Sequence, residues 1–99
     1  FAGTIFLSFL HIIQESEVIP LKLNQAVSLR LQTLLSENDM TQYQLSSRSG
    51  VPKSTISNIL HCHYDSIKLR IIHELCQGLS ISISDFFAST LFDEDNLDP

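Results

Sequence analysis

The sequence predicts an all-α fold in which short helices form one compact domain. Apolar residues recur at helical spacing along most of the chain after residue 22. Glycine and proline are scarce, at three of each, which disfavours a turn-rich β-sheet protein. The 99 residues, 43% hydrophobic and 17% charged, can bury one core without metals or disulfides. They are too few for a barrel or a doubly wound enzyme.

Residues 1–20 are interpreted as an apolar N-terminal extension. Its apolar run, FAGTIFLSFLHII at 1–13, is shorter than the about 20 residues that cross a bilayer, so we expect no membrane partner. No Lys or Arg precedes the run and no small-residue cleavage site follows it, which makes it a poor signal peptide. The extension is expected to be a packing element, or a segment upstream of a native start at Leu21.

The first helix is predicted to begin at Leu23, because apolar residues follow it at positions 27, 31, 34 and 35. Arg30 lies off this apolar stripe. Asn38-Asp39 is expected to end the helix, since Asn tolerates the left-handed conformation that often follows a helix C-terminus.

Two short helices joined by a tight turn are predicted next. Thr41 is the N-cap candidate for a helix over 42–49, and Gly50 stops that helix. The following helix is predicted over 52–60, with Pro52 in its first turn, where the missing N–H has no intrahelical partner. The inward-facing residues of this unit are Leu45, Val51, Ile56 and Ile59.

A polar loop at 61–65 leads to a fourth predicted helix, which Ser66 is expected to cap. Its apolar residues form the clearest stripe in the chain, at positions 67, 71, 72, 75, 76 and 79. Gly78 lies in its last turn.

The fifth predicted helix is short. Ser82 or Ser84 is expected to cap it, and it carries Phe86 and Phe87. Residues 91–99 form an acidic C-terminal tail.

The segment 41–60 has the properties of a helix-turn-helix unit. Ser46 is small where the two helices approach, and Gly50 lets the second helix leave at a steep angle. That angle allows the second helix to enter the major groove of DNA while the first crosses the backbone.

Residues 23–87 resemble the phage repressor/Cro-like (Xre-type) helix-turn-helix family, whose members have a small five-helix DNA-binding domain. We therefore expect a compact, repressor-like domain over 21–90. Ser46 departs from the usual Ala, Ser49 occupies a usually apolar or Ala position, and the loop 61–65 lacks the Gly and Lys common there. The matching motifs are Thr41-Gln42, Gly50-Val51, Ser54-Thr55-Ile56-Ser57-Asn58-Ile59 and Ile81-Ser82-Ile83-Ser84-Asp85-Phe86-Phe87.

The resemblance implies roles for the exposed residues of the unit. It places Lys53 and Ser54 at base edges, because Lys suits the two acceptors of guanine, and it lets Asn58 pair with adenine if that side chain reaches far enough into the groove. The residues predicted to contact bases are Lys53, Ser54, Thr55 and Asn58. Those predicted to contact the DNA backbone are Gln42, Tyr43, Arg48, Ser57, His61, His63 and Lys68. For Arg48 and Lys68, a purely solvated position is an equal alternative.

The formal net charge of −5 at first sight argues against nucleic acid as a partner. The charges are unevenly distributed, however. Residues 41–73 hold two Lys and two Arg against Asp65 alone, a net +3, whereas residues 74–99 carry a net −6. The charge therefore does not exclude DNA. It predicts modest non-specific affinity, so that specificity rests on the recognition helix and on pairing two subunits.

Ordinary structural roles account better than zinc binding or catalysis for the cysteines and histidines. His61, Cys62, His63, His73 and Cys76 include residue types that bind zinc, but Cys76 falls on an apolar stripe where a buried thiol is common. Cys62 lies beside two histidines with no oxyanion-stabilising group in evidence, and no Gly-rich phosphate loop is present. We expect no metal, no cofactor and no enzymatic activity.

The sequence therefore predicts a sequence-specific regulator of transcription that binds double-stranded DNA. We expect a homodimer on a palindromic operator with half-sites about one helical turn apart, and a reduced, cytoplasmic protein. The apolar N-terminal run and the segment 86–92 are the candidates for the dimer surface. The competing interpretation is an antitoxin, or another protein-interaction module, with a toxin or other protein as partner. A redox sensor that uses Cys62 and Cys76 is a weaker third.

Overall fold

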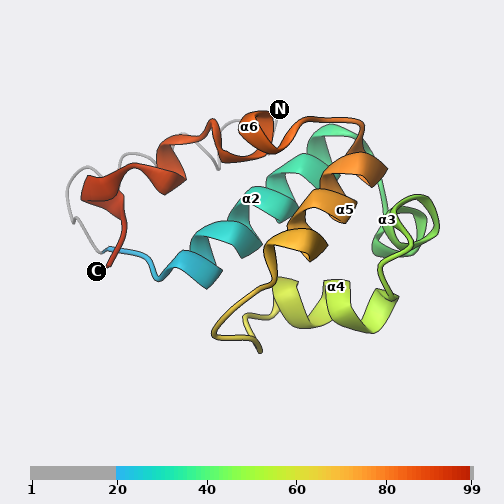
Figure 1. The fold of residues 1–99 in the computed structure, drawn as a ribbon, viewed down its shortest axis with the longest axis horizontal. Coiled ribbons are helices and arrows are strands. Elements are labelled where there is room, and N and C mark those ends of the chain that lie inside the picture. The colour runs from blue at the N-terminus through green and yellow to red at the C-terminus, as the bar shows by residue number, and fades with distance from the viewer. Residues whose placement is uncertain (1–19, 99) are drawn as a thin grey trace.

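A computed structural model describes residues 20–98 and confirms the all-α prediction (Figure 1). The predicted extension lies outside the described residues, apart from Pro20. Within the described range, extended pairing is limited to a bridge between Leu21 and Leu97, and no helix is long and apolar enough to cross a membrane. The α-helices are α2 (Leu23–Glu37), α3 (Gln42–Ser49), α4 (Lys53–Leu60), α5 (Leu69–Leu79) and α6 (Ile83–Phe87), followed by the 3-10 helices η1 (Thr90–Phe92) and η2 (Glu94–Asn96).

One core joins the helices. α3 packs against both α4 and α5, and α2 packs against α4. Burying such apolar side chains contributes roughly 1.5–3 kcal/mol each to stability. The largest fully buried side chains are Phe86, Leu31, Leu45, Ile56, Ile59, Leu75, Val51 and Cys76.

The predicted apolar stripe of α2 is buried from residue 27 onward, whereas Leu23 itself is 58% exposed. The left-handed residue after the helix is Asp39, with φ 49°, and not Asn38, whose φ is −95°. Asn38 donates to the Leu34 carbonyl twice, from its backbone N–H at 3.1 Å and from its side chain at 2.7 Å.

Arg30, which the sequence placed off the stripe, joins α2 to α6. Its Nε donates to the Phe86 carbonyl and its Nη2 to the Asp85 carbonyl, both at 2.8 Å. A cation is favourable at these carbonyls because they lie at the negative end of a helix.

The predicted ends of α3 are confirmed. Thr41 Oγ1 accepts a hydrogen bond from the Gln44 N–H at 3.1 Å, and the Gln44 side chain accepts one from the Thr41 N–H at 2.9 Å. Gly50 ends the helix in the left-handed conformation, with φ 77°. Pro52 precedes α4 as its N-cap residue rather than lying in the first turn, because its ψ of 141° is extended.

The predicted start of α5 is wrong. Ser66 does not cap the helix, which begins three residues later, at Leu69, with Lys68 at the N-cap. Ile67 packs half-buried against the core from the loop before the helix, so its place in the apolar spacing reflects tertiary packing and not helical structure. Gly78 lies in the last turn, as predicted.

Ser82, of the two candidates, caps α6, because its Oγ accepts a hydrogen bond from the Asp85 N–H at 3.0 Å. The boundary at residue 90 stays a prediction, but the chain beyond it contacts the domain. The ring of Phe92 lies edge-on to Phe87, with centroids 4.8 Å apart. The Asp98 N–H donates to the Leu21 carbonyl at 2.8 Å, while the acidic side chains of this segment are exposed.

Candidate nucleic-acid interface

A polar stripe runs along the outer side of α4. Ser54, Ser57, Asn58 and His61 have the spacing i, i+3, i+4 and i+7, which places them on one face of a helix. Ser54 and His61 are exposed, and the two residues between them are half-buried. Ile56 and Ile59 hold the opposite face in the core. Lys53 is exposed at the first turn, beside this stripe.

Thr55, also a predicted base contact, lies away from the polar stripe. It lines a pocket of about 250 Å³ between α4 and the start of α5, together with Ile59, Tyr64 and Lys68. Thr55, Tyr64 and Lys68 therefore gather at the flank of α4, and Lys68 is exposed there.

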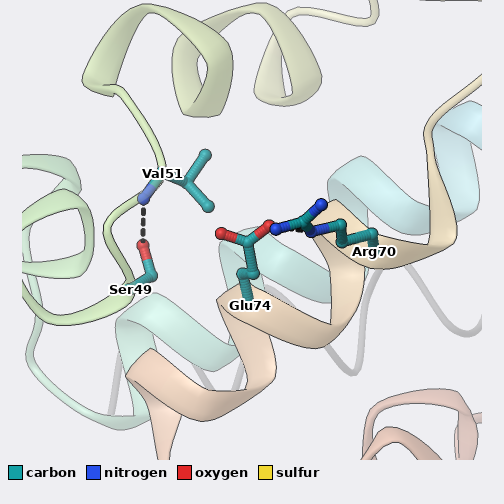
Figure 2. Close-up of polar contacts among 4 residues, drawn as sticks. All are labelled: Ser49, Val51, Arg70 and Glu74. Carbon is teal, nitrogen blue, oxygen red and sulfur yellow. Dashed lines mark hydrogen bonds and ion pairs between the residues drawn. The ribbon is translucent and has the colours of Figure 1, made fainter.

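The turn between α3 and α4 is held by two serines that depart from the family pattern. Ser46 Oγ donates to the Val51 carbonyl at 2.7 Å, and Ser49 Oγ accepts from the Val51 N–H at 3.1 Å. Figure 2 shows the second of these bonds. Both backbone groups of Val51 are thus paired in a turn that makes no regular helical bonds. The turn fixes the angle at which α4 leaves α3.

The predicted contacts on α3 do not share one face. Gln42 is half-buried and Tyr43 is 71% exposed in the first turn, whereas Arg48 is exposed in the last turn. Tyr43 and Arg48 are five residues apart, which separates them by about 140° around a helix. The structure therefore does not bring them to a single phosphate position.

The end of α4 and the following loop form a hydrogen-bonded cluster. His61 Nδ1 lies 2.8 Å from the Ser57 carbonyl oxygen, and His63 Nδ1 lies 3.0 Å from Asn58 Oδ1. Asn58 Nδ2 donates to the Tyr64 hydroxyl at 3.0 Å. The two imidazoles stack, with centroids 5.6 Å apart and an interplanar angle of 27°. Both polar groups of the Asn58 amide are thus engaged within the protein.

Two side chains of α2 form hydrogen bonds with the backbone of α4 and of this loop. Ser28, which is buried, donates to the Leu60 carbonyl at 2.6 Å, and Asn24 Nδ2 donates to the Tyr64 carbonyl at 2.8 Å. Sequence reasoning missed these residues and the role of the Tyr64 hydroxyl. Ser28 offered one signal, a small polar residue beside an apolar stripe, but its partner lies 32 residues away.

The helix-turn-helix segment carries positive charge without acidic neighbours in sequence. Residues 41–64 contain Arg48 and Lys53 and no Asp or Glu. Among residues 20–98, the one ion pair joins Arg70 and Glu74 on α5 at 3.5 Å (Figure 2). The Arg70 side chain is 88% exposed, so this pair contributes little to stability.

The cysteines and histidines do not converge. Within the described part of the chain, His, Cys, Asp and Glu form no group of three or more with a geometry for a metal ion. Cys76 is fully buried and Cys62 is half-buried in the loop. Burial raises the pKa of the Cys76 thiol, while the charge of Arg30 opposes that rise. Cys76 therefore carries an unreactive thiol.

Known proteins share the sequence pattern and the fold of this helix-turn-helix unit. Residues 30–89 match the family model of the Cro/C1-type HTH DNA-binding domain. The crystal structure of the wild-type restriction-modification controller protein C.Esp1396I is 25% identical, with a TM-score of 0.60, over 65% of this chain and 82% of that chain. A Tyr-to-Phe mutant of that controller protein is also 25% identical, with a TM-score of 0.63, over 70% of this chain and 86% of that one. No curated protein matches the sequence.

Proposed function

Because the chain belongs to the Cro/C1-type helix-turn-helix DNA-binding family, we propose that it recognises its operator by placing α4 in the major groove, as a homodimer on a palindromic site. The resemblance found in the sequence is confirmed by the family match and by the similar solved structures, and the chain is a DNA-binding regulator of transcription. The proposal concerns which residues contact the DNA and how two copies assemble on it.

The polar face of α4 carries this proposal. Ile56 and Ile59 bury the opposite face of α4 in the core. The hydrogen bond from Ser46 to Val51 fixes the turn before the helix, and the hydrogen bond from Ser28 to the Leu60 carbonyl fixes its last residue. A helix held in this way presents its first-turn side chains at a defined angle, as base recognition requires. We assign base contacts to Lys53 and Ser54, which are exposed at that first turn.

Asn58 is a weaker candidate for base recognition than its residue type suggests. Its amide must leave Tyr64 and His63 before it can pair with adenine. Thr55 stands at the flank of α4 and suits a methyl or sugar contact. The proposed backbone contacts are Gln42, Tyr43, Arg48, Ser57, His61, His63 and Lys68.

Dimer formation needs an apolar surface on each copy. The aromatic side chains of 86–92 are used within the chain, since Phe86 is buried and packs against Phe87 and Phe92. Within residues 20–98, the large aliphatic side chains that are exposed are instead Leu23 and Leu69, at 58% and 65%. Both border a pocket of about 220 Å³ with an otherwise largely apolar lining. This surface supports the pairing of two copies.

Titration of labelled DNA tests the base contacts. We expect the full chain to bind the DNA upstream of its own gene more tightly than unrelated DNA. Lys53→Ala and Ser54→Ala should each reduce that preference by roughly 5- to 150-fold, because a good base contact discriminates by about 1–3 kcal/mol.

Lys22→Ala is the matched control, because it removes one exposed cation from outside the helix-turn-helix unit. It should lower affinity for both DNAs by the same small factor. Unchanged discrimination in both α4 variants, with specific binding intact, would show that α4 is not the recognition helix.

A further inference from the structure

The loop after α4 contains a second feature whose chemistry goes beyond base recognition. We propose that His61 and His63 form a phosphate-binding pair that holds the DNA backbone only when its imidazoles are protonated, so that operator binding takes up protons. This inference rests on the proposed function, since it needs DNA seated over α4. It is carried by hydrogen bonds that determine which ring nitrogen holds the hydrogen.

His61 is the simpler case. Its Nδ1 lies 2.8 Å from the backbone carbonyl oxygen of Ser57, and a carbonyl oxygen only accepts hydrogen bonds. The Nδ1 atom therefore carries the hydrogen, and Nε2 of the neutral ring carries a lone pair. A DNA phosphate oxygen is also an acceptor, so Nε2 repels it until the ring gains a second proton and becomes a double donor.

His63 reaches the same state through Asn58. The Asn58 amide donates from Nδ2 to the Tyr64 hydroxyl, and this leaves Oδ1 as the atom that faces His63 Nδ1 at 3.0 Å. Oδ1 only accepts, so Nδ1 of His63 carries the hydrogen and Nε2 is the free nitrogen. The Tyr64 hydroxyl is the second hydrogen-bond partner of this amide.

The stacking of the two rings couples their charges to an anion. At a centroid separation of 5.6 Å, two imidazolium ions disfavour each other, and a phosphate beside both removes that penalty. Among residues 20–98, no ion pair links either ring to an acidic group. The loop itself carries Cys62, Tyr64 and Asp65, and α4 carries Lys53. Of the elements that contact the loop, α2 is preceded by Lys22 and α5 by Lys68.

The helix-turn-helix unit carries so few permanent charges that two added protons change its net charge substantially. Residues 41–64 carry two permanent cations, Arg48 and Lys53, and no acidic residue. Protonation of both histidines would double that charge. Since each neutralised phosphate adds about 0.9 to the salt dependence of the logarithm of the binding constant, the salt dependence should steepen as pH falls.

The experiment measures the dissociation constant for the upstream DNA by fluorescence anisotropy between pH 5.5 and 8.5 at constant ionic strength. We expect binding to tighten at least tenfold from pH 8 to pH 6, with a limiting slope of two protons per protomer. The double variant His61→Gln/His63→Gln should lose most of the slope. His73→Gln, an exposed histidine on α5 outside the cluster, is the matched control and should keep the slope.

Two results separate this inference from the proposed function. Specific binding with a slope that is flat, or that survives in the double variant, overturns the histidine pair and leaves the proposed function standing. Absence of specific binding at every pH overturns both. Independently of DNA, the ¹⁵N shifts of the imidazoles at pH 8 should show both rings with the hydrogen on Nδ1, and a hydrogen on Nε2 in either ring would contradict the argument. Circular dichroism confirms that the variants fold.

Discussion

Gly50 and Gly78 are needed for different physical reasons. Gly50 has φ 77°, and a Cβ added to it would meet no atom within 4 Å, so only its backbone conformation demands glycine. Gly78 has ordinary helical geometry, but an added Cβ would lie 2.8 Å from Ser49 Cβ and 3.0 Å from the Ser49 backbone nitrogen. The close approach of α5 to the end of α3 therefore depends on the absence of a side chain at 78.

This difference predicts distinct substitution patterns in urea unfolding. Gly50→Ala should cost about 1–2 kcal/mol of unfolding free energy through left-handed backbone strain, and Gly50→Asn clearly less, because Asn tolerates that conformation. Gly78→Ala should cost about 1–3 kcal/mol of overpacking, which outweighs the helix propensity gained by Ala. Gly78→Asn should be worse than Gly78→Ala. The Asn variants discriminate: Asn tolerated no better than Ala at position 50, or better than Ala at position 78, would contradict this account.

At the scale of elements, side-chain bonds from α2 determine how the other helices sit. Ser28 reaches the end of α4, Asn24 the following loop, and Arg30 the end of α6. Each satisfies a backbone carbonyl, and two of them act at helix ends, where carbonyls have no intrahelical partner. The helix outside the helix-turn-helix unit thus orients the helix that we assign to DNA recognition.

Arg30 provides the test of these links between helices. Arg30→Leu keeps much of the volume but removes both bonds to α6, and it should lower the free energy of unfolding by roughly 1.5–3 kcal/mol. Arg70→Leu is the control, because that side chain is 88% exposed and its loss should change stability by less than about 0.5 kcal/mol. Similar losses in the two variants would indicate that the α6 carbonyls are satisfied by water instead.

Considered as a whole, the molecule separates its charges along the chain. The helix-turn-helix segment is free of acidic residues, while the acidic side chains of η2 and its neighbours are exposed at the C-terminal end. That end lies far from α3 in the view of Figure 1. At physiological salt, exposed charges are screened beyond about 8 Å. We therefore propose that a single domain with few cations gains its operator affinity from two copies bound together.

The apolar surface around Leu23 and Leu69 makes this assembly testable. Leu23→Gln/Leu69→Gln adds no charge, and it should shift the sedimentation profile toward the monomer. It should weaken binding to a two-half-site operator by at least tenfold, because the second copy no longer binds cooperatively. Binding to an isolated half-site is the internal control and should not change. An unaltered oligomeric state would place the dimer surface elsewhere.

The sequence by itself determined the features that depend on neighbours within about one helical turn. The N-cap at Thr41, the left-handed Gly50, the apolar stripes of α2 and α5, and the motifs that carry the family resemblance all belong to this class. Their partners lie three or four residues away, so spacing is enough to recognise them.

Only the tertiary structure decided the contacts whose partners are distant or variable. Ile67 continues the apolar spacing of α5, yet it packs from a loop, because burial rewards position in space and not helical phase. Arg30 meets α6 across 55 and 56 residues, and Asn58 bonds to Tyr64 in a loop whose backbone Asn24 of α2 holds. Hydrogen-bond partners depend on how helices cross, and that crossing emerges when all faces of the core are buried together.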